Sequence, residues 1–278
     1  MFRYLKEFLR NILIYRNEKF HCQKIQVWAG ETCTLRCKNC SQLFPYIKPK
    51  KYDMDKVIED LKKLLKHIVP EEIHIIGGEP FVNKDIGKLI QYVCKVNPGK
   101  QNKVVSNGSI IPDKSVLDIL KANKEHIYIT VSGYDCIRDR QEKFKQIMQE
   151  NDIKCVTVWE DRDWYFMGGV GDNAIEKIKN PKTLYRNFTA CWDKTCHTIA
   201  DGELTKCPRM HNSPKVMKGE KVLFIEHLPI KMVPDNFIGT ALVATCYTDK
   251  TYRESCKYCY GVSDVNNVYC KRAEQLKN

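Results

Sequence analysis

Three cysteines near the start of the chain have the spacing of a metal site. Cys33, Cys37 and Cys40 are separated by three and then two residues, and they follow an apolar run at residues 25–28 that is typical of a strand. Three thiolates can hold three irons of a 4Fe-4S cluster, which leaves the fourth iron without a protein ligand. An open iron can bind a reactant, so this loop is the first candidate for chemistry.

Two other interpretations of these cysteines remain, namely unrelated structural thiols or part of a zinc site. A structural zinc site needs four ligands. The nearest histidines, His21 and His67, do not have the spacing of a zinc knuckle. The spacing therefore favours an iron–sulfur cluster over zinc.

A second pattern follows about forty residues later. Residues 73–76 are mostly β-branched and run directly into Gly77, Gly78, Glu79 and Pro80. Such a run predicts a buried strand, and the two glycines indicate that its carboxyl end comes close to a ligand. The cysteines and this stretch both lie where a predicted strand ends.

Together the two motifs resemble those of the radical S-adenosylmethionine (SAM) superfamily. The resemblance implies that SAM binds the open iron through its methionine end. It also implies that the methionine ammonium meets the carbonyls of Gly77 and Gly78 and the carboxylate of Glu79, in the motif that Pro80 completes. These four residues are therefore the predicted cofactor-binding residues of the second motif.

One position departs from the family pattern. The residue before the third cysteine is usually aromatic in the family and covers the adenine, whereas this chain has Asn39. Trp28 and Phe44 are the candidates to supply a ring in its place. The departure concerns the adenine contact and leaves the cysteine motif intact.

The elements that must position these motifs alternate along the chain. Apolar runs typical of strands cover residues 25–28, 73–76, 103–106, 126–133 and 153–159, and helical periodicity covers residues 52–67, 84–94, 114–124 and 138–150. This α/β alternation predicts right-handed βαβ units and a parallel sheet. The resemblance implies a partial (β/α)6 TIM-like barrel.

Polar residues follow two further predicted strands. Parallel α/β barrels bind ligands at the carboxyl ends of their strands, where Ser106, Asn107 and Ser132 lie. The resemblance assigns such groups to the carboxylate and ribose of SAM. Serine and asparagine at strand ends are also ordinary turn formers, so that interpretation stays open.

Seven more cysteines lie in the last third of the chain, at positions 191, 196, 207, 246, 256, 259 and 270. Asp201-Gly202 predicts a tight hairpin turn that brings the cysteines on either side of it together. Four thiolates can hold a second iron–sulfur cluster or a structural zinc, and their spacing does not choose between the two.

This second set resembles the auxiliary-cluster extension called SPASM, or its shortened twitch form. The resemblance implies one auxiliary 4Fe-4S cluster, held by Cys191, Cys207, Cys256 and Cys259. Cys196 is the candidate replacement ligand or a thiol that faces the substrate, and a second auxiliary cluster remains open. Cys136 follows a strand end, and we interpret it as a hydrogen-atom donor.

These patterns divide the chain into three parts. We expect an amphipathic helix within residues 1–20 that packs on the barrel, the radical SAM barrel at 21–188 and the auxiliary-cluster domain at 189–278. No strand–helix repeat is evident between Arg162 and Cys191. We interpret this stretch as an exposed connector or as a loop lining a substrate pocket.

Composition limits the function further. The chain of 278 residues has a net charge of +12, which suits an anionic substrate, and it lacks a recognised nucleic-acid motif, so we do not expect nucleic acid as a partner. No apolar run is long enough to span a membrane and no secretory signal is evident, so we expect a cytoplasmic protein with metal-bound thiolates.

The resemblance implies reductive cleavage of SAM to a 5′-deoxyadenosyl radical, with electrons from a flavodoxin- or ferredoxin-like donor. We expect an oxidoreductase or epimerase acting on a sugar-like, anionic small molecule. An auxiliary cluster would favour oxidation, and hydrogen return from Cys136 or Cys196 would give epimerisation. The alternatives are epimerisation, thioether or C–C crosslinking of a ribosomally made peptide, and a non-catalytic zinc or nucleic-acid-binding protein.

Overall fold

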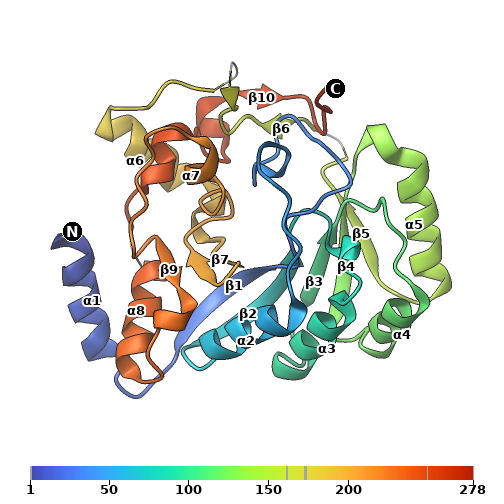
Figure 1. Ribbon diagram of the computed structural model, residues 1–278, viewed down its shortest axis with the longest axis horizontal. Helices are drawn as coiled ribbons and strands as arrows, with labels where there is room; N and C mark the ends of the chain where they lie inside the picture. The colour runs from blue at the N-terminus through green and yellow to red at the C-terminus, as the bar shows by residue number, and fades with distance from the viewer. Residues whose placement is uncertain (1, 161, 172–173, 249, 278) are drawn as a thin grey trace.

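The computed structural model describes residues 2–160, 162–171, 174–248 and 250–277 (Figure 1). The helices are α1 (Phe2–Ile14), α2 (Met54–Leu64), α3 (Ile86–Val96), α4 (Lys114–Ala122), α5 (Arg138–Glu150), α6 (Pro181–Ala190), α7 (Ser213–Val216) and α8 (Phe237–Thr248). The strands are β1 (Phe20–Trp28), β2 (Ile68–Ile76), β3 (Asn102–Ser106), β4 (Ile127–Ser132), β5 (Cys155–Val158), β6 (Trp164–Tyr165), β7 (Thr198–Ala200), β8 (Glu203–Thr205), β9 (His227–Pro229) and β10 (Tyr269–Cys270).

One large sheet has the strand order β5-β4-β3-β2-β1-β7-β8-β9. The strands from β5 to β7 in this order are parallel, whereas β8 and β9 are antiparallel to their neighbours. The predicted α/β fold with a partial TIM-like barrel is confirmed. The sixth parallel strand does not follow β5 in the chain, however, because β7 supplies it from the other side of β1.

The register of β1 and β2 places the two sequence motifs at the same level. These strands pair along their whole length, from Phe20 opposite Ile68 to Trp28 opposite Ile76. The cysteine loop therefore leaves β1 beside the point where the glycine stretch leaves β2. Both strands begin earlier than predicted, because a polar pair, Gln23-Lys24 in β1 and Glu71-Glu72 in β2, interrupts the apolar signal.

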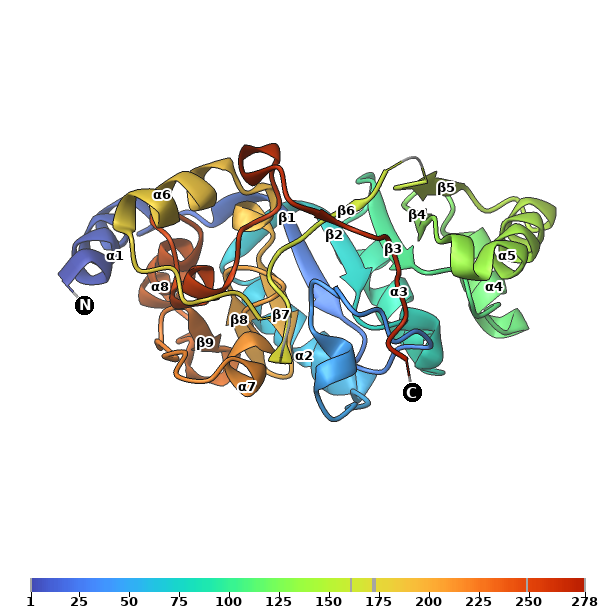
Figure 2. The same ribbon diagram turned by 90° about the horizontal axis from the view of Figure 1, so that it is seen from above.

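Helices α2 to α5 lie along the outer side of the strands (Figures 1 and 2). Each buries one apolar face, as helical periodicity predicts, and Asp53 caps α2 by accepting from the N–H of Asp55 at 3.0 Å. At the other end of the sheet, α8 lies between α1 and β1. Because α1 covers one side of α8 and β1 the other, its apolar residues are not confined to one face.

The amphipathic helix α1 packs on α8, which lies in the range predicted for the auxiliary-cluster domain rather than the barrel. The amide of Asn11 donates to the hydroxyls of Thr245 and Thr248, both at 3.1 Å. Its outer side leaves Leu9 and Leu13 more than half exposed. Among the described residues, no helix is long and apolar enough to cross a membrane.

Two details of the last third of the chain bear on the sequence predictions. The hairpin at Asp201-Gly202 is present between β7 and β8, with positive φ values of 48° and 81° at the two turn residues. Helix α6 was not predicted, because it buries only Leu184, Asn187 and Phe188 and its apolar periodicity is weak. Its one clear sequence signal is Asn180-Pro181, an N-cap followed by proline.

Candidate functional site

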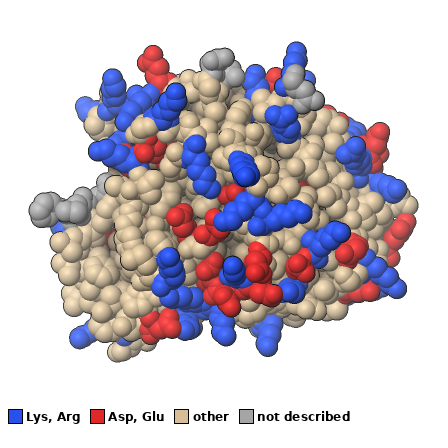
Figure 3. Space-filling model, in the orientation of Figure 1, with Lys and Arg blue, Asp and Glu red and all other residues tan. Residues whose placement is uncertain are grey.

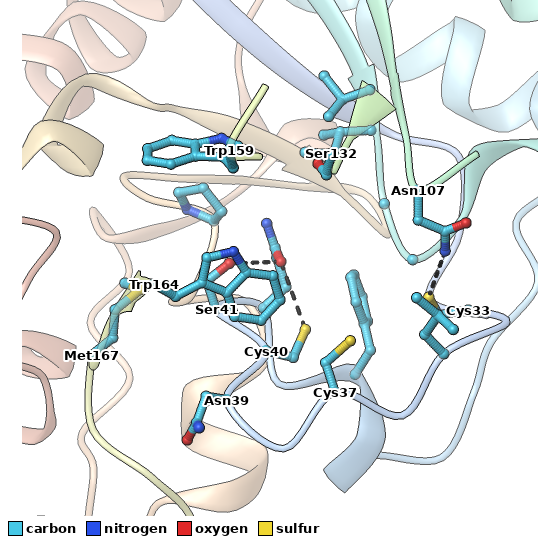
Figure 4. A pocket seen from close by; sticks show the side chains of 18 of the residues that line it. Cys33, Cys37, Asn39, Cys40, Ser41, Asn107, Ser132, Trp159, Trp164 and Met167 are labelled. Atoms are coloured by element: carbon cyan, nitrogen blue, oxygen red, sulfur yellow. Dashed lines mark hydrogen bonds between the residues drawn. The ribbon is translucent and has the colours of Figure 1, made fainter. Parts of the chain in front are cut away.

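The first cysteine motif lies in the loop after β1, at the carboxyl ends of the parallel strands. Cys33, Cys37 and Cys40 all line one cavity of about 270 Å³. Figure 4 shows the three thiols along one side of this cavity. The structure therefore brings together the three residues that the spacing indicates.

Gly77 and Gly78 hold this loop against the end of β2. The N–H of Gly78 donates to the carbonyl of Gly30 at 3.0 Å, and the next N–H donates to the carbonyl of Thr32 at 2.9 Å. A β-carbon on Gly77 would lie 2.5 Å from the Gly30 oxygen, and one on Gly78 would lie 2.1 Å from the Thr32 oxygen. Because both oxygens belong to the backbone, they cannot rotate away, and a larger side chain is excluded at both positions. Both glycines also line the cavity.

The carboxylate of Glu79 takes its partners within the protein. It accepts from the Ser106 hydroxyl at 2.9 Å, from the Asn107 N–H at 2.8 Å and from the Phe81 N–H at 3.2 Å. Burial raises its pKa to about 7, against the lowering effect of these bonds. Neither Glu79 nor the buried Pro80 lines the 270 Å³ cavity, and their contact with SAM stays a prediction.

Ser106, Asn107 and Ser132 line the cavity at the ends of β3 and β4, as expected. The amide of Asn107 donates to the sulfur of Cys33 at 3.6 Å (Figure 4). Gln141 on α5 supports this side although the sequence analysis did not select it. Its amide donates at 2.6 Å to the carbonyls of Asn107 and Ser132, and it is 4% exposed. A buried glutamine on a helix signals a polar partner, but the sequence alone does not identify that partner.

The side of the cavity opposite the thiols is largely aromatic. Trp159, Trp164 and Met167 lie there in Figure 4, and Tyr165 also lines the cavity. Two of these residues form β6, which pairs with β10. Trp164, Tyr165 and Met167 belong to the stretch between Arg162 and Cys191, whose role the sequence left open. Their position favours a pocket-lining loop over an exposed connector.

Charge is nearly absent from the cavity. Among the described lining residues, Asp193 is the charged one, and burial raises the pKa of its carboxyl against a hydrogen bond from Cys196. Many lysines and arginines instead lie on the surface, where Figure 3 shows them interleaved with acids. The excess of lysine and arginine that gives the chain its net positive charge is therefore not found among the described residues that line this cavity.

Of the two rings considered as a cover for adenine, one lies at the cavity. Phe44 lines it together with Asn39, whereas Trp28 is fully buried and does not line it. Trp28 packs on Phe44 with ring centroids 4.8 Å apart. Phe44 is therefore the ring that the structure makes available.

A second, smaller cavity of about 30 Å³ lies beside the first. Four cysteines line it, namely Cys191, Cys207, Cys256 and Cys259. Met167 and Asp193 line both cavities, so they form a shared wall. The structure thus gathers the four residues that the second resemblance selects.

Two buried arginines flank these four cysteines. Arg209 and Arg253 line the small cavity and are 3% and 2% exposed. The Nε atom of each is buried without a hydrogen-bond partner among the described residues. The terminal nitrogens are partnered, since Nη2 of Arg209 donates to the carbonyl of Gly168 at 2.7 Å and Nη2 of Arg253 donates to the carbonyl of Lys194 at 3.1 Å. Two buried positive charges beside four thiols suit an anionic metal–thiolate group, either an iron–sulfur cluster or zinc.

Burial disfavours the thiolate form of cysteines at both sites. Burial raises the pKa of Cys37, Cys191 and Cys256 to about 12. Thiolates bind metals, so the deprotonated form would be stabilised by the metal rather than by the chain. Within the described ranges, no group of three His, Cys, Asp or Glu side chains is close enough together to hold a single metal ion. That finding leaves a cluster open, because a cluster carries each thiolate on a different iron.

The two cysteines considered as hydrogen-atom donors line neither cavity. Cys136 is exposed, and its thiol donates to the carbonyl of Ala273 at 3.8 Å. Cys196 is buried and bonds to the carbonyl of Trp192. Neither lines the 270 Å³ cavity, and Cys196 does not line the second cavity either. The structure therefore does not place them next to a substrate in either cavity.

The fold and these sites define a class of protein, a partial α/β barrel with a three-thiol cavity at the ends of its strands and a four-thiol cavity next to it. Residues 29–154 match the Radical SAM superfamily. These residues therefore form a radical SAM domain, and members of that superfamily bind a 4Fe-4S cluster and SAM.

Similar proteins agree with this assignment. A GTP 3′,8-cyclase of Clostridium botulinum is 28% identical over 175 residues, which are 58% of this chain and 53% of that protein. The antilisterial bacteriocin subtilosin biosynthesis protein AlbA of Bacillus subtilis is 29% identical over 125 residues, 41% of this chain and 26% of that protein. The chain spans about half the length of the cyclases it matches.

A solved structure supports the fold along nearly the whole chain. The crystal structure of BtrN in complex with AdoMet and 2-DOIA has a TM-score of 0.53 and 14% sequence identity. The match covers 92% of this chain and 98% of that one. At this identity the similarity concerns the fold alone.

Proposed function

We propose that this chain is a radical SAM oxidoreductase that removes a hydrogen atom from a small molecule held between the cysteine loop and the aromatic wall. The observation that carries the proposal is the contact of the two cavities, which share Met167 and Asp193. When bound, a cluster on Cys33, Cys37 and Cys40 would supply reductive cleavage of SAM, and an auxiliary 4Fe-4S cluster on the other four thiols would supply an electron acceptor.

The residues around the larger cavity have separate roles in this proposal. Gly77 and Gly78 keep their backbone close to the cysteine loop and leave space for the methionine end of SAM. Ser106, Asn107 and Ser132 offer polar groups to the cavity at the ends of β3 and β4. Glu79 is a positioning residue, because it ties the ends of β2 and β3 together through Ser106 and Asn107.

The lining of the cavity narrows the class of substrate. The expected anionic substrate has no lysine or arginine to meet among the described lining residues. A nucleoside triphosphate, such as the GTP in the name of the cyclases, would need cationic partners for its phosphates. We therefore favour an uncharged or amine-bearing polyhydroxylated molecule, because Asp193 can pair with an amine or accept from a hydroxyl, and Trp159 and Trp164 can cover an apolar face.

Oxidation is favoured over epimerisation for this molecule. Epimerisation needs a hydrogen-atom donor at the substrate, but neither Cys136 nor Cys196 lines the larger cavity. Oxidation of an alcohol carbon also releases a proton, which the Asp193 carboxylate is placed to take. Its pKa is raised by burial, which makes it a better base than an exposed carboxylate.

The test begins with the anaerobically reconstituted protein. We expect iron and sulfide in the amount of two clusters, and 5′-deoxyadenosine from SAM when a strong reductant is added. Candidate amino sugars and cyclitols are then supplied, and substrate oxidation is followed by mass spectrometry. Asp193→Asn should lose substrate oxidation while it still forms 5′-deoxyadenosine. Protein with zinc and no sulfide would overturn the proposal.

A second candidate is the modification of a ribosomally made peptide, by epimerisation or by a thioether or C–C crosslink. The resemblance to AlbA, a bacteriocin biosynthesis protein by its name, favours it. A short precursor peptide encoded beside this chain would be the substrate to assay. Turnover of that peptide, with none of the small polyhydroxylated molecules, would replace the first candidate with this one.

Two further predictions belong to the proposal. We retain the division at residues 1–20, 21–188 and 189–278, although β7 to β9 extend the same sheet as β1 to β5. We also propose a flavodoxin- or ferredoxin-like protein as electron donor, because the first cluster must be reduced before SAM is cleaved. Reduction by purified flavodoxin, followed optically, tests the second statement.

A further inference from the structure

A segment far from the cysteine loop in sequence crosses the mouth of the barrel and ends beside that loop. We call residues 269–276 the strap. Figure 2 shows it running from β10 across the ends of the strands. It begins by pairing with β6, which carries Trp164 and Tyr165 of the aromatic wall. In its middle, Arg272 donates to the carbonyl of Trp159 and, at 2.9 Å, to the carboxylate of Asp135.

The end of the strap is bonded to the backbone of the cysteine motif. The N–H of Lys38 donates to the carbonyl of Glu274 at 2.7 Å, and the N–H of Leu276 donates to the carbonyl of Arg36 at 2.8 Å. Cys37 and Gln275 therefore stand opposite each other in an isolated antiparallel bridge. The loop that carries the thiols is fixed from both sides, by β2 and by the strap.

The side chain of Gln275 connects this bridge to a thiol. Its Oε1 accepts from the N–H of Arg36 at 2.8 Å. Its Nε2 donates to the sulfur of Cys37 at 3.4 Å and to the carbonyl of Ala273 at 2.6 Å. Because the backbone N–H of Arg36 can only donate, the amide oxygen must face it, and the amide nitrogen must face the sulfur.

We propose that Gln275 is a positioning residue for the iron–sulfur cluster of the first site, and that its amide raises the reduction potential of that cluster. The proposal rests on the proposed function only in requiring a cluster at Cys33, Cys37 and Cys40. An N–H group that donates to a cluster thiolate stabilises the reduced form more than the oxidised one, because reduction adds negative charge. The bond arises from residues 238 positions apart in sequence, so it depends on the strap being in place.

Three variants test this with the full chain after anaerobic reconstitution. Gln275→Leu removes the donor, and Gln275→Glu keeps an acceptor for Arg36 but turns a carboxylate oxygen towards the sulfur. Glu274→Gln is the matched control, because it removes the ion pair with Lys38 at 3.7 Å and leaves the backbone bonds in place. The readout is the midpoint potential of the first cluster in an EPR-monitored redox titration.

We expect both Gln275 variants to shift the midpoint to a more negative potential, with the larger shift in Gln275→Glu, and the control to match the parent. The midpoint does not depend on how much of the protein is loaded, so partial loss of iron leaves the result valid. Parent-like potentials in both Gln275 variants would overturn the proposal. If the parent protein itself holds no iron and sulfide, the proposed function fails instead, and the two failures are distinct.

A second measurement covers variants that load no cluster at all. The parent chain is labelled with ¹⁵N at the glutamine side-chain amides, and the reduced first cluster is examined by pulsed EPR. A ¹⁵N coupling, lost in labelled Gln275→Glu if that variant loads, supports the amide–sulfur contact. Absence of any ¹⁵N coupling in the parent excludes it.

Discussion

The two cysteine-lined cavities differ in the number of thiols they hold and in the room they leave. The first has three thiols in about 270 Å³, with polar strand ends on one side and aromatic rings on the other. The second has four thiols in about 30 Å³, with Arg209 and Arg253 beside them. A site with one protein ligand too few and space for a molecule suits a reactant, whereas a small site with four thiols suits a group that only exchanges electrons.

The two sites also differ in how they are assembled. The first set comes from a single loop, and its thiols are close in sequence before the chain folds. The second set comes from three separate places, after α6 at Cys191, after β8 at Cys207 and in the turn Glu254–Tyr258 with the residue that follows it. Chemistry at the first site can therefore be inferred from a motif, but the second site exists only in the folded chain.

The largest effect should come from removing the open site. In the variant in which Cys33, Cys37 and Cys40 are all alanine, we expect 5′-deoxyadenosine formation to fall to background. The four-thiol site should keep its iron, because the two cavities share only Met167 and Asp193 among the residues that the structure describes. Iron and sulfide analysis with EPR makes the measurement. Loss of all iron would show that the two sites are not independent.

The reciprocal change is Cys256→Ala, with Cys94→Ala as its matched control. Cys94 is buried in the core on α3 and lines neither cavity. We expect Cys256→Ala to lose the second cluster's share of iron and all substrate oxidation, while SAM cleavage without product continues. The control should keep both. Full product formation by Cys256→Ala would contradict the role assigned to the second site.

Much of the first site could be predicted from the sequence because its signals are local. The cysteine spacing, the glycines at 77 and 78 and the polar residues at strand ends all stand where strand patterns stop, and the structure places them on one cavity. Glu79 shows the limit of this argument. Its type and position predict a ligand contact, which stays a prediction, but they did not reveal that its carboxylate accepts from Ser106 and Asn107.

The residues that the sequence did not reveal are those whose partners are distant. Gln275 meets Cys37, Gln141 meets Asn107, and Asp193 stands between two cavities built from separate segments. No periodicity or spacing relates such pairs. The position of β7 beside β1 was also not predicted, because a strand of three residues has no apolar pattern that would indicate parallel pairing.

A packing variant asks how rigidly the first loop must be held. In Gly78→Ala the new carbon would lie 2.1 Å from the Thr32 oxygen, so we expect a loss of stability of about 3 kcal/mol and poor loading of the first site. Gly99→Ala is the control, because a β-carbon there meets nothing within 4 Å, although its φ is +70°. Urea unfolding, together with iron content, measures both. Equal effects of the two changes would mean that the close approach at Gly78 costs no more than the backbone strain that alanine brings at Gly99.

The smallest effect concerns a buried polar group that joins the two regions. His211 lies 3.2 Å from Glu31, which precedes the first cysteine, and 3.2 Å from Glu203 on β8. Burial opposes the charged forms, but these contacts raise the pKa of His211, lower that of Glu31 and bring that of Glu203 to about 2. The group therefore links the two cysteine regions by charge as well as by packing.

The pH dependence of this contribution follows from the signs of the shifts. The lowered carboxyl groups stabilise the fold above their unfolded pKa of about 4.5, and this part is lost as pH falls towards their folded values. The raised histidine stabilises it below about 6.5, and that part is lost as pH rises through its folded pKa. The loss of stability in His211→Gln, relative to the parent, should therefore be largest between about pH 4.5 and 6.5, where it should reach about 1 kcal/mol. It should be smaller on either side of this window. The measurement is the urea midpoint of the parent and of His211→Gln at each pH, under anaerobic conditions. His21→Gln, a change at an exposed histidine, is the control. A difference between parent and variant that does not vary with pH would show that His211 joins the regions by packing alone.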